Sequence, residues 1–390
     1  MTVTPWTRKL RMGMVGGGQG AFIGGVHRIA AALDGQIELT AGVFSRDFQN
    51  TQATGKSLYV NPDRLYRSAI DMAAAEARRP ASDRIDFVSI VTPNDAHFEP
   101  AKAFLEAGFH VVCDKPLALT LDQAEELARV VERTGRVFAL THNYTGYPLV
   151  RHARHLFRTG QMGTVRKVIV EYLQDWLMEP LEKQGSKQAA WRTNPAESGI
   201  GGAIGDIGTH AFNLLEYVTG DFVTSVSADL STFLPDRTLD EDVNALLRLK
   251  SGGKGVLTVS QVATGEENAL RLRVYASKGA IVWSQENPNY MELYRHGQPR
   301  ETLSRGRSEY LASPAGAATR TPWGHPEGYL EAFANIYTGA IDAIRRHVDG
   351  HPLPSSEYDF PTVHDGVRGM RFIYTSVESS KKGGAWVDLL

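Results

Sequence analysis

The first 143 residues alternate between short apolar runs and segments in which apolar residues recur at helical spacing. An apolar run of about 4–8 residues bounded by turn residues is typical of a buried strand, and a 3.6-residue period is typical of an amphipathic helix. Strands are expected over residues 10–15, 37–44, 86–92, 109–116 and 136–143, and helices over 24–35, 99–108 and 122–135. These repeated β-α-β units predict an α/β domain with a doubly wound parallel sheet, whose ligand lies at the carboxyl ends of its strands.

From about residue 145 the pattern changes to a period of two, interrupted by glycine-rich turns. Alternating segments cover residues 165–177, 223–234, 243–263, 270–285 and 290–297. This pattern predicts an antiparallel sheet with one covered face, and a helix is expected between its first two segments, over residues 202–220. We therefore predict two domains, one over residues 1–143 and an α+β domain over residues 144–390.

Composition narrows the classes of protein that this chain can belong to. Its 42 basic and 44 acidic residues nearly cancel and are scattered, so no nucleic-acid partner is expected. The single cysteine, Cys113, excludes an internal disulfide and a cysteine-cluster metal site, and we expect no metal. Basic residues precede the apolar run at Met12–Val15 as in a secretory signal, but glycines interrupt that run, and no apolar stretch is long enough for a membrane span. A cytoplasmic enzyme is the expected class.

Glycines cluster between the first expected strand and the first expected helix. Gly16 and Gly18 have the spacing of a dinucleotide-binding turn, in which glycine permits a tight turn and a close approach of the backbone to the phosphates. The closing glycine, Gly24, comes about three residues late. We expect Gly24 near the first helical turn and the following residues at the cofactor: Gly16, Gly18, Gln19, Gly20, Ala21, Phe22 and Ile23. A flexible loop without a ligand is the alternative.

The residues after the second expected strand bear on the choice of nucleotide. An acidic side chain at this point usually accepts hydrogen bonds from the ribose hydroxyls of NAD. This chain has Ser45 and Arg46 instead, a hydroxyl and a guanidinium that suit the 2′-phosphate of NADP, and Asp47 follows one or two positions late. The sequence leaves both NAD and NADP open.

Three further segments place polar residues where such a site would need them. Thr92, Asn94 and His97 follow the third expected strand, and Lys115 follows the fourth. Helix capping is the alternative interpretation for Asn94, and an ordinary surface charge is the alternative for Lys115.

A carboxylate and an imidazole lie four residues apart on the helix expected over residues 202–220. Asp206 and His210 therefore face the same side of that helix and suit acid–base chemistry. A helix cap and a buried structural histidine are the alternative, and a metal site lacks further ligands at suitable spacing.

The order of these motifs, GGGQGAFIG, TPNDAH, DKP, WR and DIGTH, resembles the glucose–fructose oxidoreductase, inositol dehydrogenase and MocA-like family over nearly the whole chain. The resemblance implies an N-terminal Rossmann domain that binds NAD(P)(H). It also implies a C-terminal domain with a large, mostly antiparallel open sheet that forms homodimers or homotetramers. The implied activity is the oxidation or reduction of secondary hydroxyls of sugars, glycosides or cyclitols.

Site residues follow from the resemblance position by position. The family's E-K-P motif falls on Asp114-Lys115-Pro116, with Asp in place of the usual Glu, and makes Lys115 the implied catalytic lysine. The family's D-x-x-x-H motif makes Asp206 and His210 the implied catalytic pair. The cofactor site is further expected to include Ser45, Arg46, Thr92, Asn94, His97, Asp114, Lys115, Asn143, Trp191 and Arg192. Substrate contacts are expected from Lys115, Tyr144, Arg192, Asp206, His210 and His325.

The expected reaction is a reversible hydride transfer at a ring carbinol carbon. His210 takes the hydroxyl proton, and the Lys115 ammonium faces the developing alkoxide. Aromatic side chains such as Trp191 and Tyr329 suit a polyhydroxylated substrate, and Arg192 also suits an anionic substituent. A redox-assisted glycoside-cleaving enzyme and a non-catalytic sugar-sensing relative are the alternatives.

Overall fold

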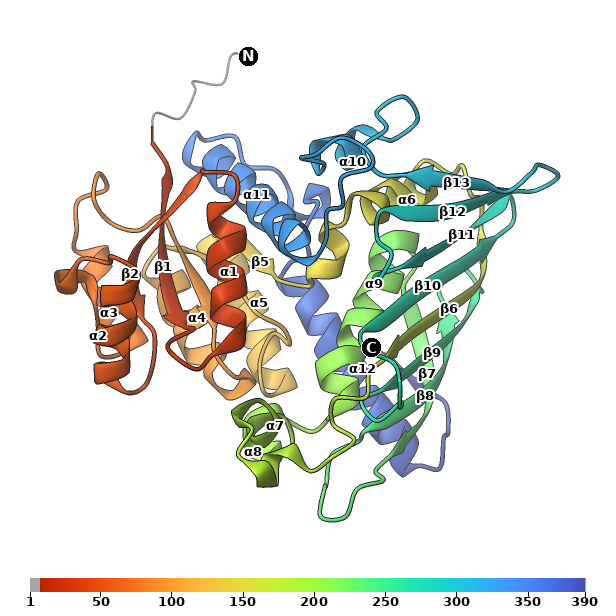
Figure 1. The fold of residues 1–390 in the computed structure, drawn as a ribbon, viewed down its shortest axis with the longest axis horizontal. Coiled ribbons are helices and arrows are strands. Elements are labelled where there is room, and N and C mark those ends of the chain that lie inside the picture. Colours follow the sequence, from red (N-terminus) through yellow and green to blue (C-terminus); the bar gives the residue numbers. More distant parts are fainter. Residues whose placement is uncertain (1–7, 390) are drawn as a thin grey trace. The chain divides into compact units, whose positions relative to one another are not determined.

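A computed structural model describes residues 8–389 and divides the chain into two compact units (Figure 1). The first unit takes in the chain up to Ala118, together with Asp122–Thr141 and Phe333–His364. The second takes in Leu119–Leu121, His142–Ala332 and the chain from Asp365 onward. Each unit has a sheet and a buried core of its own. Across residues 8–389 there is no helix with the length and apolar character needed to cross a membrane.

The described part of the first unit contains a five-stranded parallel sheet, as the sequence predicted. Its strands, in spatial order, are β2 (Ile37–Val43), β1 (Leu10–Gly16), β3 (Phe87–Val91), β4 (His110–Cys113) and β5 (Phe138–Leu140). An isolated parallel bridge joins Gly42 of β2 to Leu65. This bridge lies where a Rossmann sheet of order 3-2-1-4-5-6 has its outermost strand, so that strand is reduced here to a single pair.

Helices separate the strands of this sheet and make the parallel crossovers. They are α1 (Phe22–Ala32), α2 (Phe48–Ser57), α3 (Ala69–Ala77), α4 (Phe98–Glu106) and α5 (Leu121–Thr134), with the 3-10 turns η1 (Pro62–Arg64) and η2 (Asn94–Ala96). Most of α11 (Tyr329–Val348) also belongs to this unit. The Tyr337 hydroxyl lies 2.8 Å from both Nδ1 of the buried His27 on α1 and Oγ of Ser89 on β3. A late segment of the chain thus completes the core of the early unit.

The start of α1 differs from the expectation. The helix begins at Phe22, so Gly24 lies in its first turn as predicted, whereas Phe22 and Ile23 are helical and not part of an inserted loop. The residue before the helix, Ala21, has an extended backbone and makes no side-chain capping bond. Because no capping side chain marks this start, the local sequence carries no signal for it.

The second unit is built on a mixed, mostly antiparallel sheet of nine strands between residues 165 and 388. In spatial order they are β13 (Glu301–Ser304), β12 (Tyr290–Arg295), β11 (Gly279–Ser284), β10 (Ala269–Ala276), β6 (Val165–Leu173), β9 (Lys254–Ser260), β8 (Asp242–Leu249), β7 (Val223–Ser231) and β14 (Val387–Asp388). Only the β6–β9 pair is parallel among these described strands. Every second residue of β8 is buried, which is the alternation that predicted one covered face.

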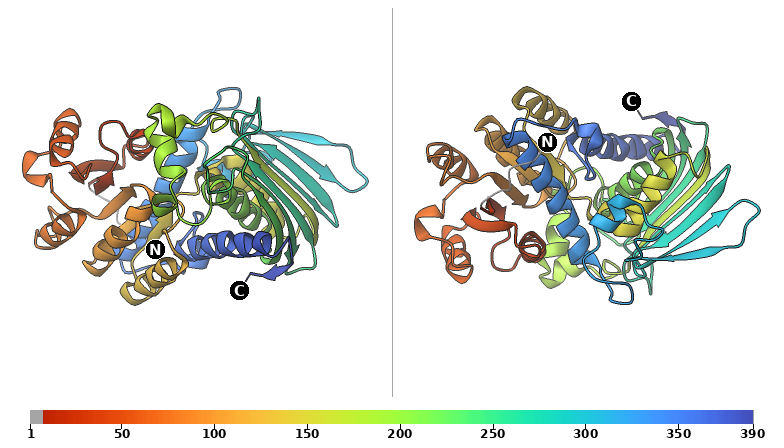
Figure 2. Two further views of the ribbon diagram at one scale, coloured as in Figure 1. Left: turned by 90° about the horizontal axis from the view of Figure 1, so that it is seen from below. Right: turned by 90° about the horizontal axis from the view of Figure 1, so that it is seen from above.

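Helices α6 (Pro148–Arg158), α9 (Thr209–Thr219) and α12 (Val363–Lys381) lie along one face of this sheet (Figure 2). The Phe212 ring of α9 stacks on Phe372 of α12 at 4.4 Å between ring centroids. The remaining elements are α7 (Lys187–Arg192), α8 (Pro195–Ser198), α10 (Ser313–Ala317), the 3-10 turns η3 (Asn143–Gly146), η4 (Leu181–Gln184) and η6 (Ser355–Glu357), and the π-helical turn η5 (Ile204–Gly208). The helix expected over residues 202–220 is therefore present, but its first part is π-helical.

Candidate active site

The glycine loop after β1 is too tightly packed for larger residues. Gly16 has a φ of +89°, and a Cβ on Gly18 would lie 2.7 Å from the carbonyl oxygen of Phe44 at the end of β2. A Cβ on Gly24 would lie 2.3 Å from the Cα of Gly17. Gly24 therefore lets the first turn of α1 pack directly on the loop, the role of the third glycine in a dinucleotide-binding turn.

Side chains that the motif did not identify hold this loop in place. The backbone N–H of Gln19 lies 3.0 Å from Asn50 Oδ1 and 3.1 Å from Thr54 Oγ1, both on α2. Arg28 donates to the carbonyl of Gly17 at 2.7 Å. The exposed loop residues Gln19–Ala21 precede the N-terminus of α1, where unpaired N–H groups favour phosphate oxygens.

We expect Gly24→Ala to weaken NADH binding by about tenfold or more, because its Cβ meets backbone atoms that no rotamer change can relieve. Titration of NADH fluorescence measures this change. Gly25→Ala is the matched control, since a Cβ there meets nothing within 4 Å and alanine is the better helix former. Equal binding by the two variants would mean that the loop does not hold the cofactor.

The segment after β2 shows why the acidic residue comes late. Asp47 caps α2 by accepting a hydrogen bond from the Gln49 N–H at 2.9 Å. Arg46 is 78% exposed and pairs with Asp95 at 2.8 Å. The Asp47 N–H donates to the Ser45 hydroxyl at 3.1 Å. The Ser45 hydroxyl and the Arg46 guanidinium therefore lie at the carboxyl end of β2, whereas the Asp47 carboxylate caps α2.

Of the candidate residues after β3, Thr92 is half-buried, and Asn94 and His97 are buried. Asn94 is buried at the start of η2, and Thr92 bonds back to the carbonyl of Ala96 at 2.9 Å. His97 has no exposed surface, and its ring nitrogens lie 2.8 Å from the Pro116 carbonyl and 2.9 Å from the Thr92 carbonyl. Burial lowers the pKa of His97, while Asp114 and the two carbonyls oppose that shift. His97 therefore joins the turns after β3 and β4 from inside the unit.

Lys115 follows β4 in a turn that its neighbours hold firmly. Asp114 Oδ1 accepts from the Lys115 N–H at 2.9 Å and from the Thr141 hydroxyl at 2.8 Å. The Lys115–Pro116 peptide bond is cis. Lys115 is half-buried at the carboxyl end of the strand, the edge of a doubly wound sheet at which ligands bind.

In the second unit, His210 lies in the first turn of α9 among other rings. Its Nδ1 lies 3.3 Å from Nδ1 of His142, and the Tyr144 ring lies 4.8 Å away between centroids. Both histidines are buried. A hydrogen bond between the rings requires one to donate and the other to accept, so at least one imidazole is neutral when the bond is made.

A chain of hydroxyl and amide groups extends from this histidine pair. The hydroxyls of Tyr144 and Tyr172 are 2.5 Å apart, and Tyr172 donates to Asn268 Oδ1 at 2.7 Å. Asn268 Nδ2 donates to Gln285 Oε1 at 3.2 Å, and Gln285 Nε2 donates to the Tyr147 hydroxyl at 3.2 Å. Burial, to which the charge of Asp206 adds, raises the pKa of both Tyr144 and Tyr172. Both phenols therefore stay protonated at neutral pH.

Asp206 lies in the π-helical turn just before α9. Its Oδ2 accepts from Arg192 Nε at 3.1 Å and from Gln261 Nε2 at 2.9 Å. The Arg192 guanidinium also lies over the Trp191 ring, 4.1 Å from its centroid. Arg192 is thus engaged by a carboxylate of its own unit, which weakens the interpretation that it awaits an anionic substrate group.

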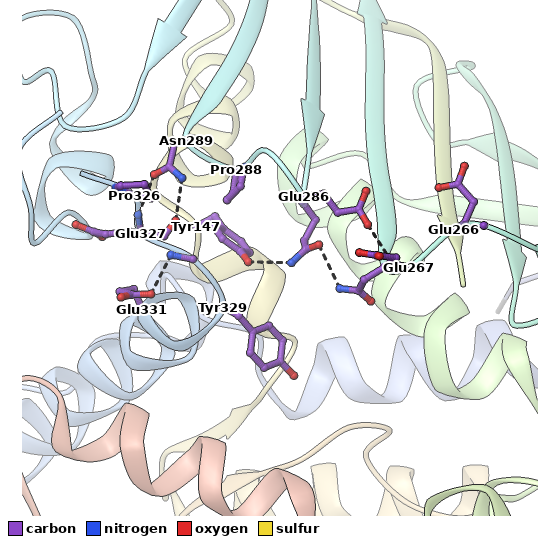
Figure 3. Close-up of a pocket in the computed structure, with 14 residues that line it drawn as sticks. Tyr147, Glu266, Glu267, Glu286, Pro288, Asn289, Pro326, Glu327, Tyr329 and Glu331 are labelled. Carbon is purple, nitrogen blue, oxygen red and sulfur yellow. Dashed lines mark hydrogen bonds between the residues drawn. The ribbon is translucent and has the colours of Figure 1, made fainter. Parts of the chain in front are cut away.

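A pocket of about 870 Å³ opens beside this network (Figure 3). Asn268, Gln285, Tyr147 and Tyr329 line it together with five carboxylates, and none of its lining residues is basic. Glu266, Glu267 and Glu286 lie on one side, and Glu327 and Glu331 lie on the other. The exposed His325 is not among the lining residues, so the structure places it outside this pocket.

Two observations test whether these residues fit a dinucleotide. In the first unit, the packing of Gly18 against Phe44 and of Gly24 against Gly17 holds the loop in a compact turn just before the N-terminus of α1, the place at which a pyrophosphate binds in such a fold. In the second unit Asn143 is 2% exposed, and its Nδ2 has no hydrogen-bond partner among residues 8–389. A buried amide donor without a partner suits a carboxamide oxygen. The loop of the first unit therefore fits the pyrophosphate of a dinucleotide, and Asn143 of the second unit, taken by itself, fits a nicotinamide carboxamide. Among the same residues no group of three or more His, Cys, Asp or Glu is placed to hold a metal.

Comparison with known proteins agrees with this chemistry. Residues 10–142 match an oxidoreductase family with an NAD-binding Rossmann fold, and residues 150–282 match a GFO/IDH/MocA C-terminal domain. The oxidoreductase YfiI of Bacillus subtilis is 33% identical over 98% of this chain and 97% of its own length.

Solved structures resemble the chain over nearly its whole length. An oxidoreductase from Sinorhizobium meliloti is 43% identical, with a TM-score of 0.86 over 98% of this chain and 100% of the other. An inositol dehydrogenase homolog from Azotobacter vinelandii, in complex with NADH and myo-inositol, is 34% identical, with a TM-score of 0.90 over 98% of both chains.

Proposed function

This chain belongs to the GFO/IDH/MocA family of NAD(P)-dependent oxidoreductases, and on that basis we propose that it reversibly oxidises a secondary ring hydroxyl of an uncharged sugar or cyclitol. The observation that carries the proposal is the buried His210, which lies 3.3 Å from His142 and within a cluster of tyrosines. An imidazole with a pKa ordinarily of about 6.5 is suited to accept a hydroxyl proton near neutral pH.

The cofactor would be held by the glycine loop Gly16–Ala21 and the first turn of α1, with Ser45 and Arg46 near the adenosine end and Asn143 at the nicotinamide. A nicotinamide held by these residues would supply the two-electron hydride acceptor that the oxidation of an alcohol to a ketone needs. Thr92 and Asn94 follow β3 and Lys115 follows β4 in the first unit, and we assign all three to the cofactor site because ligands bind at the carboxyl ends of such strands. NAD and NADP are both accommodated by this proposal.

Three side chains have separate roles in the proposed reaction. His210 accepts the proton that leaves the substrate hydroxyl and returns it in the reductive direction. The Lys115 ammonium stabilises the negative charge that develops on the same oxygen, a contribution of the oxyanion-hole kind. Asp206, fixed by Arg192 and Gln261, provides an oriented negative charge in the second unit.

The side chains that line the pocket of the second unit favour an uncharged, polyhydroxylated substrate. Asn268 and Gln285 line the pocket and offer donors and acceptors for hydroxyl groups, and the rings of Tyr147 and Tyr329, also in its lining, suit the C–H faces of a sugar. Of the five carboxylates of the pocket, Glu266 pairs with Arg271 and Glu327 pairs with the buried Arg305, and the other three oppose a phosphate or carboxylate substituent. The related Azotobacter structure contains myo-inositol, an uncharged polyol, which agrees with this choice.

We expect myo-inositol, D-glucose or D-galactose to reduce NAD or NADP, and D-glucuronate to do so with a kcat/KM about tenfold lower than that of D-glucose, because like charges repel. Absorbance of the reduced nicotinamide follows the reaction with each cofactor in parallel. Turnover of D-glucuronate alone, or of none of these compounds, would contradict the proposed substrate class. Reduced cofactor released in step with ketone formation also separates a dehydrogenase from an enzyme that keeps its cofactor and cleaves a glycoside.

A homodimer or homotetramer through the sheet of the second unit is part of the proposal. On the face of the sheet opposite its buried residues, Leu246 is 51% exposed and Tyr275 is 39% exposed. Exposed apolar side chains on a long sheet favour burial against a second copy. Sedimentation equilibrium of the wild-type protein tests this, and a monomer at micromolar concentration would refute it.

A further inference from the structure

Gln261 is a buried polar residue that no motif in the chain identified. It directly follows β9 and is 2% exposed. Its backbone N–H donates to the Glu241 carbonyl at 2.9 Å, and its own carbonyl accepts from the Leu177 N–H at 3.1 Å. Both partners are backbone groups, so hydrogen bonds to neighbouring segments fix the backbone of Gln261 in place.

The side chain of Gln261 is aimed at a single atom. Its Nε2 lies 2.9 Å from Asp206 Oδ2, the same oxygen that accepts from Arg192 Nε at 3.1 Å. Arg192 is itself held, since its Nη1 donates to Gln188 Oε1 at 2.7 Å. Two N–H groups donate to this oxygen, and an ionised carboxylate accepts such bonds better than a protonated one. The arrangement therefore favours the ionised form of Asp206 and restricts the orientation of its carboxylate.

The backbone that carries Asp206 is fixed by a second buried acid. Asp240 accepts from the N–H groups of Gly202 at 2.6 Å and Ile204 at 2.7 Å, which holds the start of the π-helical turn. Burial raises the pKa of Asp240 to about 6. The charged or titratable groups around Asp206 include Arg192 from α7, Asp240 from the loop before β8, His210 four residues along the helix, and the phenols of Tyr144 and Tyr172, whose pKa values the Asp206 charge helps to raise. Gln261 is the amide that donates to this carboxylate.

We propose that Gln261 is a positioning residue for the reaction: through its bond to Oδ2 it keeps the Asp206 carboxylate ionised and oriented for proton transfer at His210. The inference rests on the proposed function, because it assigns Asp206 and His210 to one proton-transfer unit. Gln261 does not touch the substrate in this scheme. Its effect reaches the reaction only through the charge and orientation of Asp206.

Gln261→Met keeps the length of the side chain and removes the donor. A carboxylate that loses a hydrogen-bond donor takes up its proton at higher pH, so the acid limb of the kcat/KM profile should move upward by about one pH unit. The carboxylate is also less firmly oriented without this bond, and for that reason we expect kcat at pH 6.5 to fall about tenfold, with a smaller change in KM. The profile is measured with the best substrate among the four compounds named above.

Two further variants separate charge from packing. Gln261→Glu places a second carboxylate beside Asp206, so the acid limb should move further than in Gln261→Met. Gln261→Asn keeps the amide but is one methylene too short to reach Oδ2, so it should behave like Gln261→Met. A residue that only fills space would show loss of thermal stability in all three variants and an unchanged acid limb, and that result would overturn the inference.

Gln298→Met, on the exposed turn after β12, is the control for the substitution itself. NADH binding and the melting temperature are measured for every variant to confirm that each folds. If His210→Ala retains full turnover, the role that the proposed function gives to His210 fails, and the inference fails with it whatever Gln261 does. If His210→Ala is inactive and the acid limb of Gln261→Met coincides with that of the wild type, only the role of Gln261 is refuted.

Discussion

His210→Ala is expected to lower kcat by about 10²–10⁴-fold, the usual contribution of a positioned general acid or base. The physical reason is that the substrate hydroxyl loses its proton acceptor, while the buried histidine and tyrosine cluster leaves few routes for water to replace it. NADH affinity should change by less than about threefold, because the assigned role of His210 is at the substrate. Steady-state kinetics with the substrate panel and NADH fluorescence titration measure the two quantities.

The control for this substitution is His296→Ala, which removes an exposed imidazole on the turn after β12 of the same unit. It should keep wild-type kcat. A His210→Ala enzyme with kcat within a few-fold of wild type would remove His210 from the proton chemistry. His142, 3.3 Å away, would then be the next residue to replace.

Lys115→Met should lower kcat by about 10²–10³-fold while NADH binding is largely retained. The variant keeps the aliphatic length of the side chain and loses the ammonium that opposes the developing alkoxide charge. The turn itself should persist, since Asp114 holds it through the Lys115 backbone N–H and the Thr141 hydroxyl and not through the Lys115 amine. Kinetics and fluorescence titration again separate turnover from binding.

Lys102→Met is the matched control, because Lys102 is a half-buried lysine of the same unit that pairs with Glu126. It should leave both kcat and NADH affinity near wild type. If Lys115→Met instead abolished NADH binding, Lys115 would be a phosphate or ribose ligand, and the charge on the alkoxide would need another partner.

The glycine loop shows which structural features a local sequence motif predicts and which it does not. The sequence placed Gly24 in the first helical turn because a strand, a glycine cluster and a helix pattern follow one another directly, and the structure confirms that position. It misplaced the start of α1 by two residues, because Ala21 provides no side-chain cap. Gly24 is necessary because any Cβ on it would lie 2.3 Å from the Cα of Gly17. That contact depends on the packing of helix on loop and is visible only in three dimensions.

The π-helical turn shows a second limit. Spacing predicted one regular helix through Asp206 and His210, and local propensity contains nothing to distinguish a π turn from an α turn. The structure has η5 at Ile204–Gly208, where the distant carboxylate of Asp240 takes the N–H groups of Gly202 and Ile204. β13 and β14 were also missed, since strands of four and two residues are too short to show a period of two.

The sequence by itself determined the parallel sheet of the first unit and the mostly antiparallel sheet of the second, and its motifs led to the family that the comparisons confirm and, through that resemblance, to the nicotinamide cofactor. These features depend on periodicity and on glycine at fixed spacing, both of which are local. The tertiary structure alone decided which groups surround the candidate residues. His142 meets His210 across 68 positions of sequence, and Gln261 meets Asp206 across 55. Such pairs form because strands and helices far apart in the chain pack together, and no local sequence pattern predicts those contacts.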